Sequence, residues 1–207
     1  MLEQIVDDHD FSRLRILVRK PYELQEPKLE TVQVDFNILP ELKNAIGMGD
    51  TIFSCIGTTM KQVKGDKVKY RSIDFDINVN VAKLALEKGF TRFVLMSAVG
   101  ANPSSSNFYL LLKGETEAAI AAMPFEAVHI MQPSMLLGQR EEHRAGEKFA
   151  KNISKAISPL LWGGLKKYKP IESSIVAAAM IAASKLPIKG VHRYGYTEMM
   201  GLIQASK

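Results

Sequence analysis

Short apolar runs alternate with segments of helical periodicity along most of this 207-residue chain. Runs with the composition of strands cover residues 14–19, 30–36, 51–56, 93–97, 126–132 and 191–194. Between them, apolar residues recur at helical spacing, most clearly over 72–88 and 107–123. Strands separated by helices pair in parallel through right-handed crossovers. The sequence therefore predicts an α/β fold, with a doubly wound, largely parallel, Rossmann-like sheet.

The composition limits the class of protein. Apolar residues make up 46% of the chain and charged residues 24%, which is typical of one well-cored domain, so we predict a single domain over 1–207. The apolar runs are too short to span a membrane, and the first residues lack a signal pattern, which predicts a cytoplasmic protein. A single cysteine, Cys55, excludes an intrachain disulfide, and the scattered histidines predict no metal site.

The net charge of +5 raises the possibility of an anionic partner. The densest basic stretch, Lys61 to Arg71, holds five cations in eleven residues, but no row of aromatic residues accompanies them. A solvated loop and a nucleic-acid contact are both possible interpretations. We favour the loop and predict a small-molecule substrate rather than nucleic acid.

One stretch carries candidate chemistry. Ser97 ends an apolar strand, and Tyr109 and Lys113 follow four residues apart at the start of a helix, where they share a face. A phenol, with a pKa near 10, is a poor acid or base at neutral pH unless a cation favours the phenolate. Lys113 would supply that cation, while Ser97 binds a carbonyl oxygen and Tyr109 transfers its proton. The alternative is a surface helix with an ordinary Tyr and Lys.

Several motifs in this order resemble a known family. They are Arg-Ile-Leu-Val-Arg-Lys-Pro at 15–21, Cys-Ile-Gly-Thr-Thr at 55–59, Ile-Asp-Phe-Asp at 73–76, Ser97, Asn-Phe-Tyr-Leu-Leu-Leu-Lys-Gly-Glu at 107–115 and Leu-Leu-Gly-Gln-Arg-Glu-Glu-His-Arg-Ala-Gly-Glu at 136–147. Their order and spacing resemble the atypical short-chain dehydrogenase/reductases, the branch of the human Tat-interacting protein and its bacterial oxidoreductase relatives. The resemblance spans almost the whole chain.

The resemblance implies a catalytic trio of Ser97, Tyr109 and Lys113, with Lys113 also reaching the nicotinamide ribose. It implies NADP(H) as cofactor, because Arg19 and Lys20 stand where NAD enzymes place an acidic residue, and cations there suit a 2′-phosphate. The remaining cofactor positions that it implies are Asp35 and Phe36 for the adenine, Cys55, Ile56, Gly57 and Thr58 beside the dinucleotide, and Pro133 and Ser134 beside the nicotinamide. Residues from about 134 to 207 would form the substrate side.

The sequence departs from the family at its beginning. The family opens with a strand and a Gly-x-x-Gly-x-x-Gly turn that presents a helix N-terminus to the pyrophosphate, and the fourteen glycines of this chain contain no such spacing. We therefore expect a sheet that lacks its first strand in the middle, weak NADPH binding, and a longer polypeptide of which this chain is a shortened version.

The predicted function is that of an NADP-dependent oxidoreductase, acting on the carbonyl or alcohol of a small substrate through Ser97, Tyr109 and Lys113. The alternative is a non-catalytic NADP(H)-sensing or scaffold protein, since one fold can serve several functions.

Overall fold

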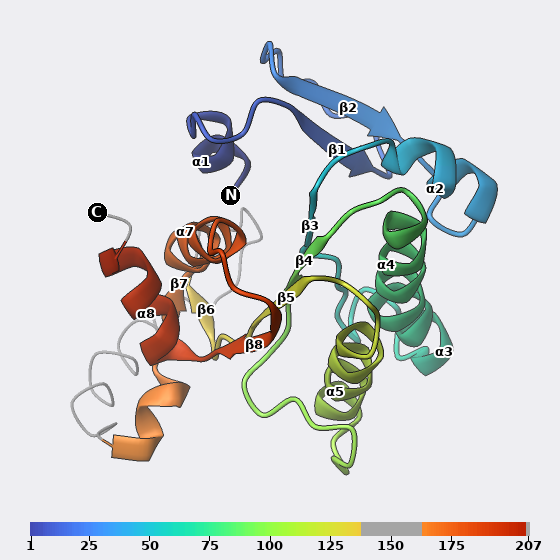
Figure 1. Ribbon diagram of the computed structural model, residues 1–207. Helices are drawn as coiled ribbons and strands as arrows, with labels where there is room; N and C mark the ends of the chain where they lie inside the picture. The colour runs from blue at the N-terminus through green and yellow to red at the C-terminus, as the bar shows by residue number, and fades with distance from the viewer. Residues whose placement is uncertain (138–162, 206–207) are drawn as a thin grey trace.

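The structure, a computed structural model, describes residues 1–137 and 163–205 (Figure 1). Its strands are β1 (Leu14–Val18), β2 (Leu29–Gln33), β3 (Thr51–Ser54), β4 (Arg92–Met96), β5 (Ala127–Met131), β6 (Leu136–Leu137), β7 (Ile171–Glu172) and β8 (Gly190–Tyr194). Its α-helices are α1 (Leu2–Val6), α2 (Leu39–Ile46), α3 (Lys67–Arg71), α4 (Ile77–Glu87), α5 (Phe108–Ala121), α7 (Ser173–Ser184) and α8 (Tyr196–Ala205). A π-helical turn covers Ser72–Asp76 and a 3-10 helix Gly163–Tyr168. The helix predicted around 148–158 lies outside the described residues.

The strands pair in parallel throughout the described chain. The main sheet has the order β3-β4-β5-β8, and two further pairs are β1-β2 and β6-β7. Helices cover both faces of the main sheet (Figure 1). The predicted α/β fold with a largely parallel sheet is confirmed.

The sheet is interrupted between β1 and β3. Within residues 1–137 and 163–205, no strand pairs with both of them, and in Figure 1 the β1-β2 pair stands apart from the main sheet. All five residues of β1 are only half-buried, whereas all five of β5 are buried. The pair is attached through α2, where Arg15 donates to the Ala45 carbonyl at 3.1 Å while also binding Glu30 of β2. This is the place where the sequence predicts a missing strand.

Alternate side chains of the central strands enter two separate cores, as a period of two requires. Phe93 of β4 packs with α2, α4 and α5 on one face. Val94, the next residue, packs with α7 and α8 on the other. The main sheet is therefore covered on both faces, which is why β4 and β5 read as continuous apolar runs in the sequence.

Helix α5 is fixed at its start by two local features. Asn107 caps the helix, with its side-chain oxygen accepting the Leu110 N–H at 3.1 Å. At Gly114 the β4–α5 connection crosses the helix so closely that a Cβ would lie 2.3 Å from the Pro103 nitrogen. These contacts hold the first turns of α5, which carry Tyr109 and Lys113, against the connection that follows Ser97.

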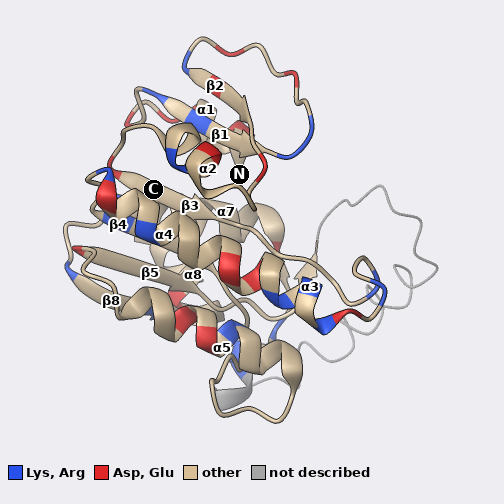
Figure 2. Ribbon diagram, turned by 90° about the vertical axis from the view of Figure 1, so that its right-hand side faces the viewer, with Lys and Arg blue, Asp and Glu red and all other residues tan. Residues whose placement is uncertain are grey.

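The stretch from Lys61 to Arg71 is not entirely the solvated loop that the sequence predicts. Its second half forms α3, which begins at Asp66, where the carboxylate accepts the Lys69 N–H at 2.9 Å. Lys and Arg residues gather on α3 and the adjoining loop in Figure 2. The sequence predicted that a helix begins at Ser72. The helical segment begins earlier because Asp66 caps the N-terminus of α3.

Candidate functional site

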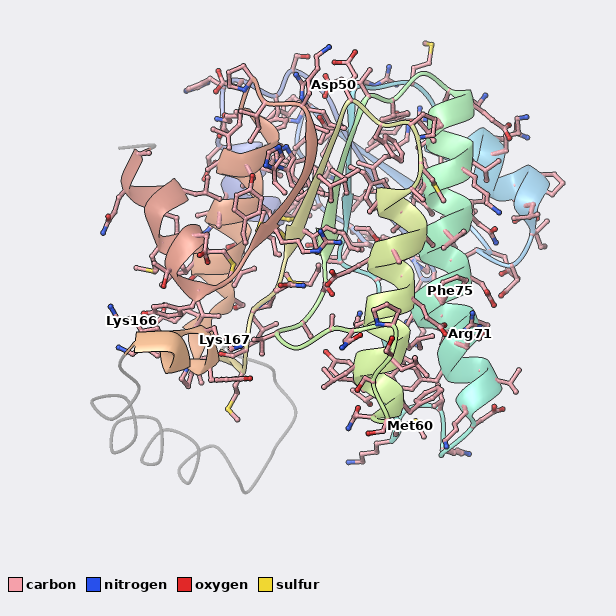
Figure 3. All side chains as sticks on the ribbon, turned by 60° about the horizontal axis from the view of Figure 1, so that its bottom comes forward. Asp50, Met60, Arg71, Phe75, Lys166 and Lys167 are labelled. Carbon is pink, nitrogen blue, oxygen red and sulfur yellow. The ribbon has the colours of Figure 1, made fainter. Side chains whose placement is uncertain are left out.

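The candidate site lies at the carboxyl ends of the parallel strands, where ligands bind in open α/β sheets. Figure 3 shows Asp50, which precedes β3, at one end of the molecule, and Met60, Arg71 and Phe75 at the other. The segment 55–58, which follows β3 directly, leads toward this second end.

A pocket of about 230 Å³ opens between the ends of β1 and β3. It is lined by Leu17, Arg19, Phe36, Cys55, Ile56, Gly57, Ile73 and Ile77. Five of these were predicted as cofactor-binding residues, and they come from three separate parts of the sequence. Apolar walls beside one guanidinium fit a flat base next to an anionic group, so these residues are chemically suited to the adenosine part of a dinucleotide.

Two further predicted cofactor residues lie on the surface outside the lining of this pocket. Lys20 is exposed, one residue beyond Arg19. Asp35 is also exposed, and its carboxylate accepts the Asn37 backbone N–H at 2.9 Å. Both lie in the chain next to lining residues, so the structure places them at the rim rather than in the wall.

Pro133 and Ser134 follow β5 and also lie outside the pocket lining. Pro133 is buried, and its carbonyl accepts the Val99 N–H at 2.9 Å. Ser134 donates its hydroxyl to the Lys169 carbonyl. The two residues connect the ends of β4 and β5 to the part of the chain after residue 163.

The thiol of Cys55 is chemically quiet. Although the residue is exposed, its sulfur lies 3.9 Å from the sulfur of Met180 in α7. Desolvation by the surrounding protein raises the pKa of this thiol to about 11. At neutral pH the thiol is therefore protonated.

Lys113 is buried and paired with a carboxylate that the sequence analysis did not single out. Its ammonium lies 3.0 Å from Asp74 Oδ1, and the other oxygen of Asp74 accepts the Thr58 N–H at 2.7 Å. Gly57 lies directly above this pair, since a Cβ there would be 3.3 Å from Asp74 Oδ1. Burial raises the pKa of Asp74, and the charge of Lys113 opposes that rise. A carboxylate between the apolar residues Ile73 and Ile77 was the signal available in the sequence.

Tyr109 lies one turn before Lys113 on α5 and is 41% exposed. Partial burial raises its pKa, and the negative charge of Asp74 raises it further. The sequence predicted that Lys113 would lower this pKa. The structure differs because burial and the negative charge of Asp74 both disfavour the phenolate, so the phenol keeps its proton at neutral pH.

Ser97 is held away from this group by a different carboxylate. Its hydroxyl donates to Glu117 Oε1 at 2.5 Å, and Glu117 also accepts from Gln132 at 2.8 Å and from Arg193 at 3.1 Å. Glu117 follows Lys113 by one helical turn, so Ser97 lies along the same face of α5 as Tyr109 and Lys113. The structure brings Lys113 together with the segment 55–58 and places the Ser97 hydroxyl in a separate buried network.

A parallel sheet covered by helices, with a pocket at the carboxyl ends of its strands, defines a Rossmann-like nucleotide-binding protein. Residues 1–144 match the family model described as NAD(P)H-binding. The chain belongs to this NAD(P)H-binding family.

Curated relatives agree with this assignment. "Protein FMP52, mitochondrial" of Debaryomyces hansenii is 33% identical over 176 residues, covering 83% of this chain and 73% of that protein. Protein HTATIP2 of Rattus norvegicus is 33% identical over 156 residues, covering 74% of this chain and 64% of the rat protein. The predicted resemblance to the atypical short-chain dehydrogenase/reductases is confirmed. At 64% coverage, the match spans less than two thirds of the length of rat HTATIP2.

Solved structures of similar fold show the same architecture. MoeE5 in complex with UDP-glucuronic acid and NAD has a TM-score of 0.70 at 13% identity, with 100% of this chain and 77% of that chain covered. DesIV, a dTDP-glucose 4,6-dehydratase from Streptomyces venezuelae with NAD bound, has a TM-score of 0.64 at 13% identity, covering 99% and 74%. At this identity the likeness establishes the fold alone.

The predicted cytoplasmic location is not supported by the relatives, because the fungal protein carries "mitochondrial" in its name. No helix within residues 1–137 and 163–205 is long and apolar enough to cross a membrane. In the same residues, no group of three or more His, Cys, Asp or Glu side chains is arranged to hold a metal ion.

Proposed function

We propose that this protein is an NADP-dependent oxidoreductase that acts on the carbonyl or alcohol of a small molecule. The observation that carries the proposal is the position of Lys113. Its buried ammonium would lie 3.7 Å from a Cβ at Gly57, and Gly57 lines the pocket beside Arg19. The face of α5 that bears Tyr109 and Lys113 therefore adjoins the segment proposed to hold the dinucleotide.

The cofactor, when bound, supplies or accepts a hydride at its nicotinamide. The residues of this chain hold it at the other end: Phe36 and Ile56 pack against the adenine, and the Arg19 guanidinium pairs with the 2′-phosphate. Lys20 and Asp35 assist from the rim, and the turn at Cys55 to Thr58 passes the dinucleotide. Pro133 and Ser134 turn the chain beside the nicotinamide.

Tyr109 transfers the proton. The phenol, which burial and Asp74 keep protonated, would donate its proton to the oxygen of a carbonyl as the carbonyl carbon accepts a hydride, and would recover the proton in the reverse direction. Ser97 supports this site from β4. The described residues after Pro133 would form the substrate side, and Figure 3 shows Lys166 and Lys167 across the molecule from Arg71.

Replacement of Tyr109 by Phe tests the chemistry. We expect turnover of NADPH with a panel of aldehydes and ketones to fall about 10²- to 10⁴-fold, because that is the usual contribution of a positioned acid. Tyr196→Phe, in α8, is the matched control, because α8 packs against the other face of the sheet. A near-normal rate in Tyr109→Phe would show that the phenol is not the proton donor.

Replacement of Arg19 by Ala tests the cofactor preference. The unmutated protein should bind NADPH in preference to NADH, and Arg19→Ala should weaken NADPH binding by about ten- to a hundredfold, the worth of a charged hydrogen bond. Binding of NADH should change little. Arg13→Ala, an exposed change before β1, is the control. Equal affinity of the unmutated protein for the two cofactors contradicts the proposal.

One observation favours the alternative, a non-catalytic NADP(H)-sensing or scaffold protein. The Ser97 hydroxyl donates to Glu117, so a substrate oxygen must compete with a buried carboxylate for it. A sensor should bind NADPH without oxidising it against the whole carbonyl panel, and its affinity should be the same in Tyr109→Phe.

A further inference from the structure

A chain of buried polar groups runs from β3 through α4 to α5. The Ser54 hydroxyl donates to Asn78, and the Asn78 amide donates to the Asp74 carbonyl at 2.8 Å. The Thr116 hydroxyl of α5 donates to the Leu112 carbonyl at 2.8 Å and lies 3.3 Å from the same Asp74 carbonyl. Asp74 therefore occupies the junction between the two helices and the strand that lead to the candidate site.

The Asp74 carboxylate is almost completely enclosed, with 1% of its side chain exposed. A buried carboxylate is costly unless it is paired and hydrogen-bonded. Its two oxygens contact different elements. Oδ1 forms an ion pair with Lys113 of α5, and Oδ2 accepts the backbone N–H of Thr58 after β3. The carboxylate thus joins the helix that carries the proposed acid to the segment that lines the cofactor pocket.

The backbone conformation at Asp74 explains why its side chain points toward Lys113 and Thr58. Asp74 lies in the π-helical turn Ser72–Asp76, where one extra residue per turn interrupts the helix between α3 and α4. Such turns re-aim side chains, and they recur at functional sites. Asp76, two residues later in the same turn, is exposed to solvent. The turn therefore presents two identical carboxylates in opposite environments.

We infer that Asp74 is the positioning residue of the proposed site, holding the Lys113 ammonium beneath Gly57 and Thr58. This inference rests on the proposed function for its chemical meaning. Asp74 fixes the Lys113 ammonium beside Gly57, where it would be available to the ribose of a dinucleotide, and its negative charge acts on Tyr109. The phenol consequently stays protonated until a ligand changes the balance of charge around it.

The first test follows the ionisation of Tyr109 in Asp74→Asn by the ultraviolet absorbance of tyrosinate, assigned by its loss in Tyr109→Phe. The titratable groups that interact with Tyr109 are Asp74 and Tyr70 of α3, and Lys113 stands one helical turn later on α5. Removal of the Asp74 charge should move the Tyr109 ionisation to lower pH. Asp76→Asn, the matched change in the same turn, should leave it in place. An unchanged Tyr109 titration in Asp74→Asn overturns the inference. It would mean that Asp74 acts only through its shape and hydrogen bonds, which Asn retains, and that its charge has no effect on the site.

A second variant removes the other member of the Asp74–Lys113 pair. In Lys113→Met, the carboxyl carbon of Asp74, followed by nuclear magnetic resonance, should titrate at higher pH than in the unmutated protein, because the ammonium lowers the pKa of that carboxyl. The same pH in both proteins overturns the inference. Neither test requires turnover. If both shifts occur and no carbonyl compound is reduced, the oxidoreductase proposal fails while the role of Asp74 in holding Lys113 stands.

Discussion

The β1-β2 pair and the four-stranded sheet β3-β4-β5-β8 follow the same sequence rules but reach different degrees of burial. Phe93 of β4 and Ile130 of β5 are 0% exposed, whereas every residue of β1 is half-buried. β4 and β5 each have two partner strands and helices on both faces, whereas β1 pairs only with β2 among the strands of residues 1–137 and 163–205. Strand composition is thus sufficient to form a strand, and burial depends on the neighbours that the fold supplies.

The difference matters because the candidate site draws on both regions. Arg19 follows β1, and Phe36 follows β2, so this part of the pocket wall stands on the less buried pair. Tyr109 and Lys113 stand on α5, which packs on the main sheet. Local opening is easiest where few apolar groups are buried, so the cofactor side should open more readily than the catalytic side.

The largest effect is expected on the main-sheet side, at the pair that joins α5 to the segment after β3. Lys113→Met leaves the Asp74 carboxylate buried without its cation, which should lower the free energy of unfolding by about 3–5 kcal/mol in denaturant titrations at neutral pH. The double variant Asp74→Asn/Lys113→Met should recover most of this loss, because no unpaired charge remains. A single variant as stable as the unmutated protein would mean that the pair does not stabilise the contact between α5 and the segment after β3.

The comparison itself is tested by the same substitution in the two sheets. Ile130→Ala in β5 should cost about 2–5 kcal/mol, the range for a fully buried side chain, because it leaves a cavity between packed helices and strands. Ile16→Ala in half-buried β1 should cost about half as much. Equal losses, measured by chemical denaturation, would remove the distinction between the two regions.

A smaller, pH-dependent effect is expected within the main sheet. His129 of β5 is fully buried, and its Nδ1 lies 2.9 Å from the Tyr194 hydroxyl. Desolvation, with the charges of His192 and Arg92, lowers the pKa of His129 from 6.5 to about 4. The unfolded chain therefore takes up a proton as the pH falls below about 6.5, while the folded chain stays neutral until about pH 4. Stability is retained above pH 6.5 and decreases by about 3 kcal/mol on acidification to pH 4.

This decrease is measured as the pH dependence of unfolding in the unmutated protein and in His129→Leu. The variant is expected to lack the component between pH 6.5 and 4, whatever its absolute stability. If both proteins lose stability equally over that range, another group is responsible.

The sequence predicted most of the secondary structure because local periodicity is strong in this chain. The strands at 93–97 and 126–132 and the helices at 72–88 and 107–123 lie within a few residues of β4, β5, α4 and α5. The two-residue strands β6 and β7 were missed, since they are too short to show any alternation. They exist only because the chain after β5 meets the chain before α7.

The site could be predicted in part. Arg19, Phe36 and Gly57 meet in one pocket, as expected of residues that follow neighbouring strands at one edge of a sheet. The sequence placed Glu117 on the same face of α5 as Tyr109 and Lys113, but its hydrogen bond to Ser97, twenty residues away, could not be predicted. Hydrogen bonds between distant residues depend on packing, which no local pattern encodes.

The sequence by itself determined the family, the alternation of strands and helices, and the identities of Tyr109 and Lys113 on one face of a helix. Only the tertiary structure decided where the charges meet. The pairing of Lys113 with Asp74, and with it the raised pKa of Tyr109, arises because α5, the π-helical turn and the end of β3 converge in a space from which water is excluded. Where water is excluded, electrostatic interactions are strong, so the charge of the Asp74 carboxylate affects the pKa of Tyr109 in a way that residue spacing does not predict.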